Sequence, residues 1–366
     1  MRAEEECGEL NPQEGESKGE RRSAGEVNDL LGLNIAWEDG LHLAGFENVR
    51  LRLGGTIMVD GGAVGSDEDL ATAFNGLEGG RSLLRRLRLN LSGTISRAVE
   101  FKTDFDFANA REIKDQWIRF PGVPVLERFR FGHQKEPFSL EEQTSSNHIT
   151  FMETALPTEA FAPGRNFGIR YDDAAPDLRT TWAGGVFWST SSYSNTAEAK
   201  DSLTNPEGIN VTARLTHLLR YENNGKDMLH LGLGSSHQFH YTAEDASGVK
   251  LGAHPETRLT TRKLVGTVPF SIDNSELFNA EFAMVEGPFS FQSECCLDFT
   301  QSEEDHFFWG FYLYASGFLT GESPKYNRSK AVFTGVDMNH LVSSPARRMG
   351  SPGTGFLRLC NREEWR

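Results

Sequence analysis

The sequence predicts an all-β protein built as one long antiparallel meander. From about Val49 onward, apolar and polar residues alternate with a period of two, and these runs end in polar or glycine-rich turns. No run of roughly 18 apolar residues occurs, which excludes a transmembrane helix. The alternation leaves two folds open: a sheet in water with its apolar face inward, or a transmembrane β-barrel with its apolar face toward lipid.

The composition limits the classes of partner. The 366 residues can form one large all-β domain, and the apolar content is 38%. A formal net charge of −15 argues against a nucleic-acid partner. It does not exclude an anion pore, because pore selectivity depends on the charges that line one constriction. The four cysteines show no metal-ligand spacing, and no cofactor is expected.

The chain divides into three predicted regions. Residues 1–44 are expected to be disordered, because their first part is charged and nearly free of large apolar residues, and no signal peptide is visible there. Residues 45–335 hold the alternating strands, about 13 of them. Residues 336–366 are expected to form an irregular tail, because they show no alternation.

The strands can be placed in chain order. Leu87, Leu89 and Leu91 alternate with Arg86 and Arg88, and later strands show the same pattern. Further strands are expected near residues 100–107, 115–120, 128–131, 165–172, 179–190, 208–218, 228–240, 276–286, 288–300 and 306–319. One face of these strands carries large apolar side chains, and the other carries charges of both signs, which a water-filled lumen tolerates. This favours the membrane barrel.

Residues 139–163 interrupt the meander. They lack the period of two, and Ser139 with Glu142 fits a capping box, which predicts a short helix after Phe138. The segment keeps apolar residues such as Phe151 and Phe161, so it must pack against something. In a barrel the available space is the lumen, which makes this segment a predicted constriction loop.

Several stretches resemble the phosphate-selective porin O and P family. The matching stretches are 85–94, 100–107, 115–119, 131–142, 144–153, 162–168 and 311–322. The resemblance covers roughly residues 45–335 and implies a sixteen-stranded outer-membrane barrel, usually trimeric, with an inward-folded third loop. It also implies passive diffusion of small anions, phosphate or polyphosphate, without catalysis. The last strands of the family pattern are not visible here, which predicts an incomplete barrel.

The predicted anion site lies at the constriction. Alternation turns Arg86 and Arg88 toward the lumen. The resemblance places cations of the second strand and the lysine after the fifth strand at the narrow zone, which implies Arg85, Arg86 and Lys135. The remaining candidates are Ser139 as a neutral donor, Asp115 as a neighbouring acceptor, and Arg165 as an anchor for the loop or part of the entrance.

Each assignment has a structural alternative. Arg86 and Arg88 can be lumen charges paired with Asp104 or Asp106, Arg85 can sit at the membrane edge, and Lys135 can pair with Glu136 or Glu141. The histidines His230, His237 and His240 do not share one strand face, so no metal site is expected. Two other functions remain open: a non-conducting truncated barrel protein of the envelope, and a soluble β-rich glycan-binding protein.

Overall fold

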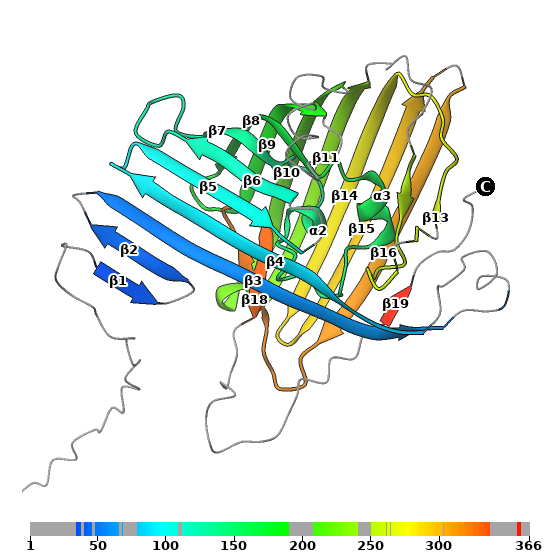
Figure 1. Ribbon diagram of the computed structural model, residues 1–366, viewed down its shortest axis with the longest axis horizontal. Helices are drawn as coiled ribbons and strands as arrows, with labels where there is room; N and C mark the ends of the chain where they lie inside the picture. The colour runs from blue at the N-terminus through cyan, green and yellow to red at the C-terminus, as the bar shows by residue number, and fades with distance from the viewer. Residues whose placement is uncertain are drawn as a thin grey trace, which may run out of the picture.

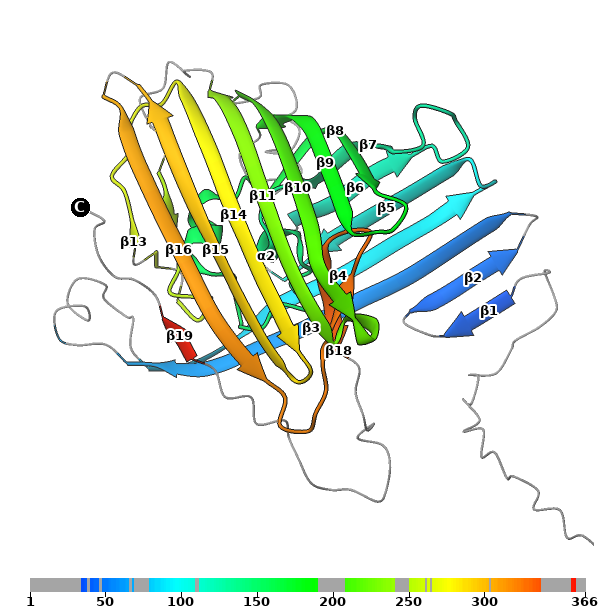
Figure 2. The same cartoon turned by 180° about the vertical axis from the view of Figure 1, so that it is seen from behind.

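The computed structural model describes residues 34–37, 40–45, 48–65, 68, 79–108, 112–189, 208–240, 250–260, 262–263, 265–302, 304–336 and 357–359. Their dominant feature is a curled 15-stranded antiparallel sheet in which successive strands are neighbours. Within these residues, no strand pairing joins the two edge strands β1 and β19 to each other. Figures 1 and 2 show the sheet curving round a central space that holds the two short helices.

The strands of this sheet are, in order, β1 (Asn34–Trp37), β2 (Leu41–Gly45), β3 (Val49–Val64), β4 (Gly79–Ile95), β5 (Val99–Asp106), β6 (Glu112–Arg119), β7 (Phe129–Lys135), β8 (Arg165–Ala174), β9 (Thr180–Ser189), β10 (Gly208–Glu222), β11 (Asp227–His240), β14 (Asn274–Glu286), β15 (Phe289–Gln301), β16 (His306–Gly317) and β19 (Leu357–Leu359). A 3-10 turn, η1 (Asn223–Gly225), joins β10 to β11. The strands predicted from alternation are therefore confirmed, with bounds that differ by a few residues.

The burial pattern of the wall is the reverse of that in a soluble sheet protein. On β11, Leu231 and Leu233 are 40% and 63% exposed, whereas the polar His230 and Ser236 on the opposite face are fully buried. The neighbouring strands repeat this arrangement, with Val211 and Phe278 exposed on the outside. An outer apolar face and an inner polar face are the pattern of a membrane barrel. The barrel alternative is thus the one that the structure supports.

The predicted loop lies inside the barrel. Loop L3, residues 136–164, connects β7 to β8 and carries α2 (Leu140–Gln143) and α3 (Leu156–Phe161). Ser139 caps α2, because its Oγ accepts a hydrogen bond from the Glu142 N–H at 3.1 Å. The short helix expected from the capping box is confirmed. Figure 1 shows α2 and α3 on the inner side of the curved sheet.

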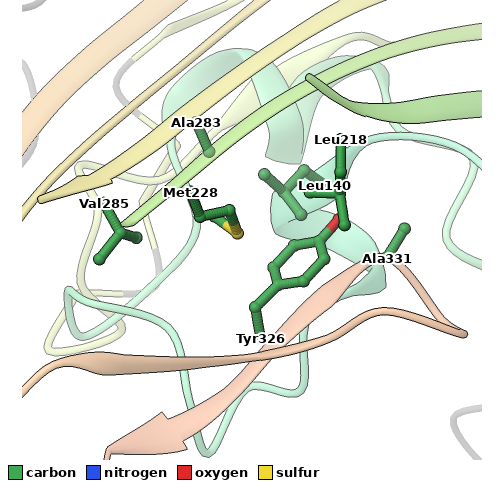
Figure 3. Packing of buried hydrophobic residues seen from close by; sticks show 7 residues of the cluster. All are labelled: Leu140, Leu218, Met228, Ala283, Val285, Tyr326 and Ala331. Atoms are coloured by element: carbon green, nitrogen blue, oxygen red, sulfur yellow. The ribbon is translucent and has the colours of Figure 1, made fainter. Parts of the chain in front are cut away.

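Two more segments fold inward beside L3. The loop between β11 and β14 contains β12 (Gly252–Ala253) and β13 (Val265–Gly266), which pair with each other. After β16, β17 (Pro324–Asn327) and β18 (Val332–Val336) form a separate hairpin. Tyr326 and Ala331 of this hairpin pack with Leu140 of α2 and with Leu218, Met228, Ala283 and Val285 of the wall, as Figure 3 shows.

Two boundaries differ from the sequence-based expectation. β1 and β2 already pair with each other and with β3, so strand structure begins before residue 45; residues 1–33 lie outside the described part. β19 adds a strand within the expected irregular tail. Between these ends, the described part of the sheet has twelve strands, β3–β11 and β14–β16, close to the expected number of about 13. Short strands such as β19 are recognised through their partner, and alternation cannot reveal them over three residues.

Among the described residues, no helix is long and apolar enough to cross a membrane.

Candidate functional site

A β-bulge brings two neighbouring arginines to the lumen. Between β3 and β4 the register slips, because Met58 pairs with Arg86 whereas Val59 pairs with Leu84. Arg85 is therefore the extra residue and escapes the strict alternation. Its guanidinium binds the Glu153 carboxylate of L3 with two hydrogen bonds, the longer one at 2.8 Å. The sequence-based alternative that placed Arg85 at the membrane edge is wrong for this reason.

Arg86 shares the same carboxylate. Its Nη2 lies 3.6 Å from Glu153 Oε2, and its Nη1 lies 2.8 Å from the Met58 sulfur. The side chain is only 3% exposed, and its Nε has no hydrogen-bond partner among the described residues. Two guanidiniums thus face one carboxylate of L3, and Asp60 of β3 also interacts electrostatically with both.

Arg88 also faces the lumen and contacts both the wall and L3. Its Nε donates to Asp106 Oδ2 at 2.9 Å, and its Nη1 donates to Ser146 Oγ at 3.2 Å. The pairing with Asp106 is the structural alternative derived from the sequence, and for Arg88 it is confirmed. For Arg86 that alternative is wrong, since its carboxylate partner is Glu153 rather than Asp104 or Asp106.

A second group of charges surrounds Asp115 on β6. Arg165, at the start of β8, donates through Nε to Asp115 Oδ1 at 2.8 Å, and Lys102 binds the other carboxylate oxygen. Lys102 also lies 4.0 Å from Asp104. Asp104 interacts electrostatically with Arg88, Lys102 and Arg165, so the two groups adjoin along the same wall. Asp115 is therefore a neighbour of the cations, as expected.

Lys135, at the end of β7, and Ser139, near the start of L3, both make hydrogen bonds that stabilise the loop. The Lys135 ammonium donates to the backbone oxygens of Glu142 and Thr144 and lies 3.3 Å from the Glu142 carboxylate. Its carboxylate partner is thus Glu142. The alternative pairing of Lys135 with Glu136 or Glu141 is wrong, because α2 turns Glu142 back over the end of β7. Ser139 is fully buried and caps α2 with its hydroxyl oxygen.

Buried carboxylates hold L3 against the opposite wall. Glu294 of β15 accepts the N–H groups of Leu140 and Glu141 at 3.0 and 2.8 Å and the Tyr312 hydroxyl at 2.6 Å. Glu141 in turn accepts the Ala155 N–H at 2.9 Å. These bonds satisfy backbone donors at the start of α2, which would otherwise be buried without partners.

Glu136 makes a comparable anchor at the beginning of L3. Its fully buried carboxylate accepts hydrogen bonds from Asn166, Asn210 and Thr212, the first two at 2.7 and 2.8 Å. Burial raises the pKa of Glu136, and these hydrogen bonds oppose the shift by stabilising the charged form. The sequence analysis did not identify Glu136, Glu153 or Glu294 as functional residues. For Glu153 a signal was available, because it is an acidic residue within 139–163, the segment that interrupts the alternation of the meander.

The other inward segments are fastened by ionic contacts. Glu159 on α3 accepts from the His254 backbone N–H at 3.1 Å and from Arg258 at 2.8 Å, which ties the β11–β14 loop to L3. The hairpin is tied by the Tyr326 hydroxyl, which lies 2.7 Å from His230 Nδ1. The other ring nitrogen of His230, Nε2, lies 3.0 Å from Glu281 Oε2. Across the described residues, no cluster of three His, Cys, Asp or Glu side chains has the arrangement of a metal site.

A family model matches residues 57–349, described as phosphate-selective porin O and P. The chain belongs to the phosphate-selective porin O and P family. This porin is therefore a channel protein of the outer membrane and not an enzyme. The family resemblance found in the sequence is confirmed over well more than half of the chain.

A search of solved structures found matches of low sequence identity. An anion-selective porin from Comamonas acidovorans has 13% identity and a TM-score of 0.49, with 75% of this chain and 77% of that chain covered. The trimer form of OmpT, an outer membrane protein from Vibrio cholerae, has 9% identity and a TM-score of 0.35, with 79% and 95% covered. The search of curated protein sequences gave no match.

Proposed function

We propose that this porin conducts small anions across the outer membrane and selects phosphate or polyphosphate at the cationic wall formed by Arg85, Arg86, Arg88, Lys102 and Arg165, together with Lys135 of β7. The observation that carries the proposal is the pair Arg85 and Arg86 facing a single carboxylate, Glu153. Arginine suits this role because its planar fork of donors matches the oxygens of an oxyanion.

The carboxylates of the wall explain how an anion can leave again. A pore must bind its solute strongly enough to attract it and weakly enough to release it. Glu153, Asp106 and Asp115 already neutralise part of the cationic charge. An entering phosphate competes with these carboxylates for the arginines, so neither the phosphate-bound nor the free site is strongly favoured. Asp115 and Glu153 thus moderate the affinity.

The fate of the other predicted site residues follows from their contacts. Arg165 joins the anion-facing wall and at the same time borders the end of L3. Ser139 is a helix cap, and we assign it to holding L3 in shape rather than to contacting the anion. A homotrimer and contact with outer-membrane lipid complete the proposal; the exposed apolar side chains of the wall support the lipid contact. The division of the chain into a leading segment, a porin barrel and a tail stays a prediction, although the strands β1 and β19 lie outside residues 45–335.

The test is a bilayer recording with the full chain folded in detergent. We expect chloride currents that phosphate blocks, and we expect Arg86→Ala to raise the half-blocking phosphate concentration about tenfold, equivalent to about 1.4 kcal/mol. Arg128→Ala is the matched control, because Arg128 is half exposed and pairs with Asp173 outside the cationic wall; it should change the block less than about twofold.

Three other outcomes would contradict parts of the proposal. Conduction without phosphate block leaves the porin function and removes the phosphate selectivity. Correctly folded protein that inserts without conducting supports the non-conducting envelope barrel. Protein that stays monodisperse without detergent supports the soluble glycan-binding alternative, against which the exposed apolar outer face weighs.

A further inference from the structure

A cavity lies between L3 and the strands β15 and β16. It measures about 570 Å³ and is bordered by L3, by these two strands and by the hairpin β17–β18. This volume lies within the range of small-molecule sites in proteins. The anion site proposed above uses none of its lining residues.

Hydroxyl and amide side chains dominate the polar lining. They come from L3, β15, β16 and the hairpin, and are Thr144, Asn147, Thr150, Ser290, Gln292, Tyr314, Ser316 and Thr334. Several are already joined in a network: Thr150 donates to the Tyr314 hydroxyl at 3.2 Å, and Tyr314 donates to Gln292 Oε1 at 2.8 Å. A hydroxyl can donate one hydrogen bond and accept two, so such a network orients groups toward a ligand without exhausting their capacity.

The charges of the cavity do not favour an anion. Its charged or titratable lining residues are Glu141, His148 and Lys325. Burial lowers the pKa of His148, so the imidazole is neutral at pH 7. One carboxylate then balances one ammonium, in contrast to the excess of guanidinium around Glu153. A phosphate would gain little electrostatic energy here.

Aromatic rings complete the lining. Tyr314 packs edge-on against Phe151 with ring centroids 5.4 Å apart, and Phe318 and Phe333 also border the cavity. Rings combined with a few oriented polar groups suit a ligand that has both apolar C–H faces and hydroxyl edges. Sugars have this combination of surfaces.

We propose that this cavity is a subsite for a neutral polyhydroxylated solute, a short oligosaccharide, beside the anion path. Hydroxyl groups of the sugar exchange hydrogen bonds with Gln292, Thr150 and Ser316, and its C–H faces pack on the rings. The proposal does not depend on phosphate selectivity, and binding can be measured without any conductance.

The experiment is isothermal titration of the full chain, folded in detergent, with maltotriose as the probe. We expect binding in the millimolar range that inorganic phosphate does not displace. Gln292→Ala should weaken it at least tenfold, whereas the matched control Gln238→Ala, on the lumen face of β11 and away from the cavity, should change it less than twofold. Gln292 also donates a hydrogen bond to the Tyr312 hydroxyl, so its substitution also tests folding. Thr150→Val on L3 is therefore the second variant, and it should weaken maltotriose binding at least threefold. Absence of maltotriose binding, equal loss in the control, or displacement by phosphate would overturn the proposal.

Discussion

The two sides of L3 are held by different kinds of contact. Toward β4 and β7, the loop is held by ion pairs of Glu153 with Arg85 and Arg86 and of Glu142 with Lys135, and the cationic side chains are between 3% and 17% exposed. Toward β10–β16, it is held by the carboxylates of Glu136 and Glu294, which are at most 1% exposed and accept three hydrogen bonds each. One side is held by ion pairs, and the other by a buried scaffold of hydrogen bonds.

The difference shows how a loop can be rigid and still present exchangeable charge. A carboxylate buried in a wall must satisfy its hydrogen-bonding capacity, so it fixes the backbone that supplies the donors. Ion pairs hold the loop through side-chain charges, and these charges can also pair with an entering anion. We therefore expect substitutions on the scaffold side to affect folding and substitutions on the cationic side to affect anion passage.

The largest effect is expected from Glu294→Ala. Two buried N–H groups at the start of α2 and the Tyr312 hydroxyl lose their acceptor, which should lower the free energy of unfolding by about 2–5 kcal/mol. L3 should also leave the lumen, so the single-channel conductance should rise. Urea unfolding in lipid vesicles, followed by tryptophan fluorescence, and bilayer recording measure the two effects. Glu112→Ala removes a more exposed carboxylate as the control, and an equal loss in both variants would show that Glu294 is no special anchor.

A smaller effect should appear in the pH dependence of stability. The pKa of Glu136 lies above its ordinary value of 4.5, so the folded chain holds this proton at a pH where the unfolded chain has released it. The contribution of Glu136 is therefore largest below pH 4.5 and falls as the pH rises toward the raised pKa, with a slope of at most about 1.4 kcal/mol per pH unit. Glu136→Gln should flatten this part of the curve in urea unfolding between pH 4 and pH 8. Identical curves for both proteins would contradict the assignment.

Glu153→Gln tests the cationic side. The substitution keeps the size of the side chain and removes the charge shared by Arg85 and Arg86. Phosphate should then block the chloride current at a concentration about 3–10-fold lower, a change of about 1 kcal/mol. Stability should change less than it does for Glu294→Ala. Glu112→Gln provides the matched control, and a weaker phosphate block in Glu153→Gln would show that this carboxylate organises the arginines rather than competing with the anion.

The smallest effect is expected for Arg119→Ala. Arg119 pairs with Glu100 across β5 and β6, and both side chains are about one-third exposed. Water screens such a pair, so its loss should change the free energy of unfolding by only about 0.2–1 kcal/mol and leave the phosphate block unchanged. The same urea titration and bilayer recording measure both quantities. A loss as large as that of Glu294→Ala would remove the distinction between the two sides of L3.

Local pattern was enough to predict the wall and the presence of L3. Alternation along residues such as Leu87 and Arg88 specifies two faces of a strand, because successive side chains point in opposite directions. The capping box of Ser139 and Glu142 likewise acts within four residues, and it marked α2 correctly. Arg86 and Arg88 were placed on the lumen side for the same reason.

The partners of these side chains were decided only by the tertiary structure. Arg85 meets Glu153 across 68 positions, and Leu140 meets Glu294 across 154. Alternation assigns a face but carries no information about which distant loop will lie opposite that face, and the bulge that turns Arg85 inward depends on the register with β3. The hairpin of β17 and β18 folds into the lumen because Tyr326 finds its partner, His230, on a wall strand 96 positions earlier.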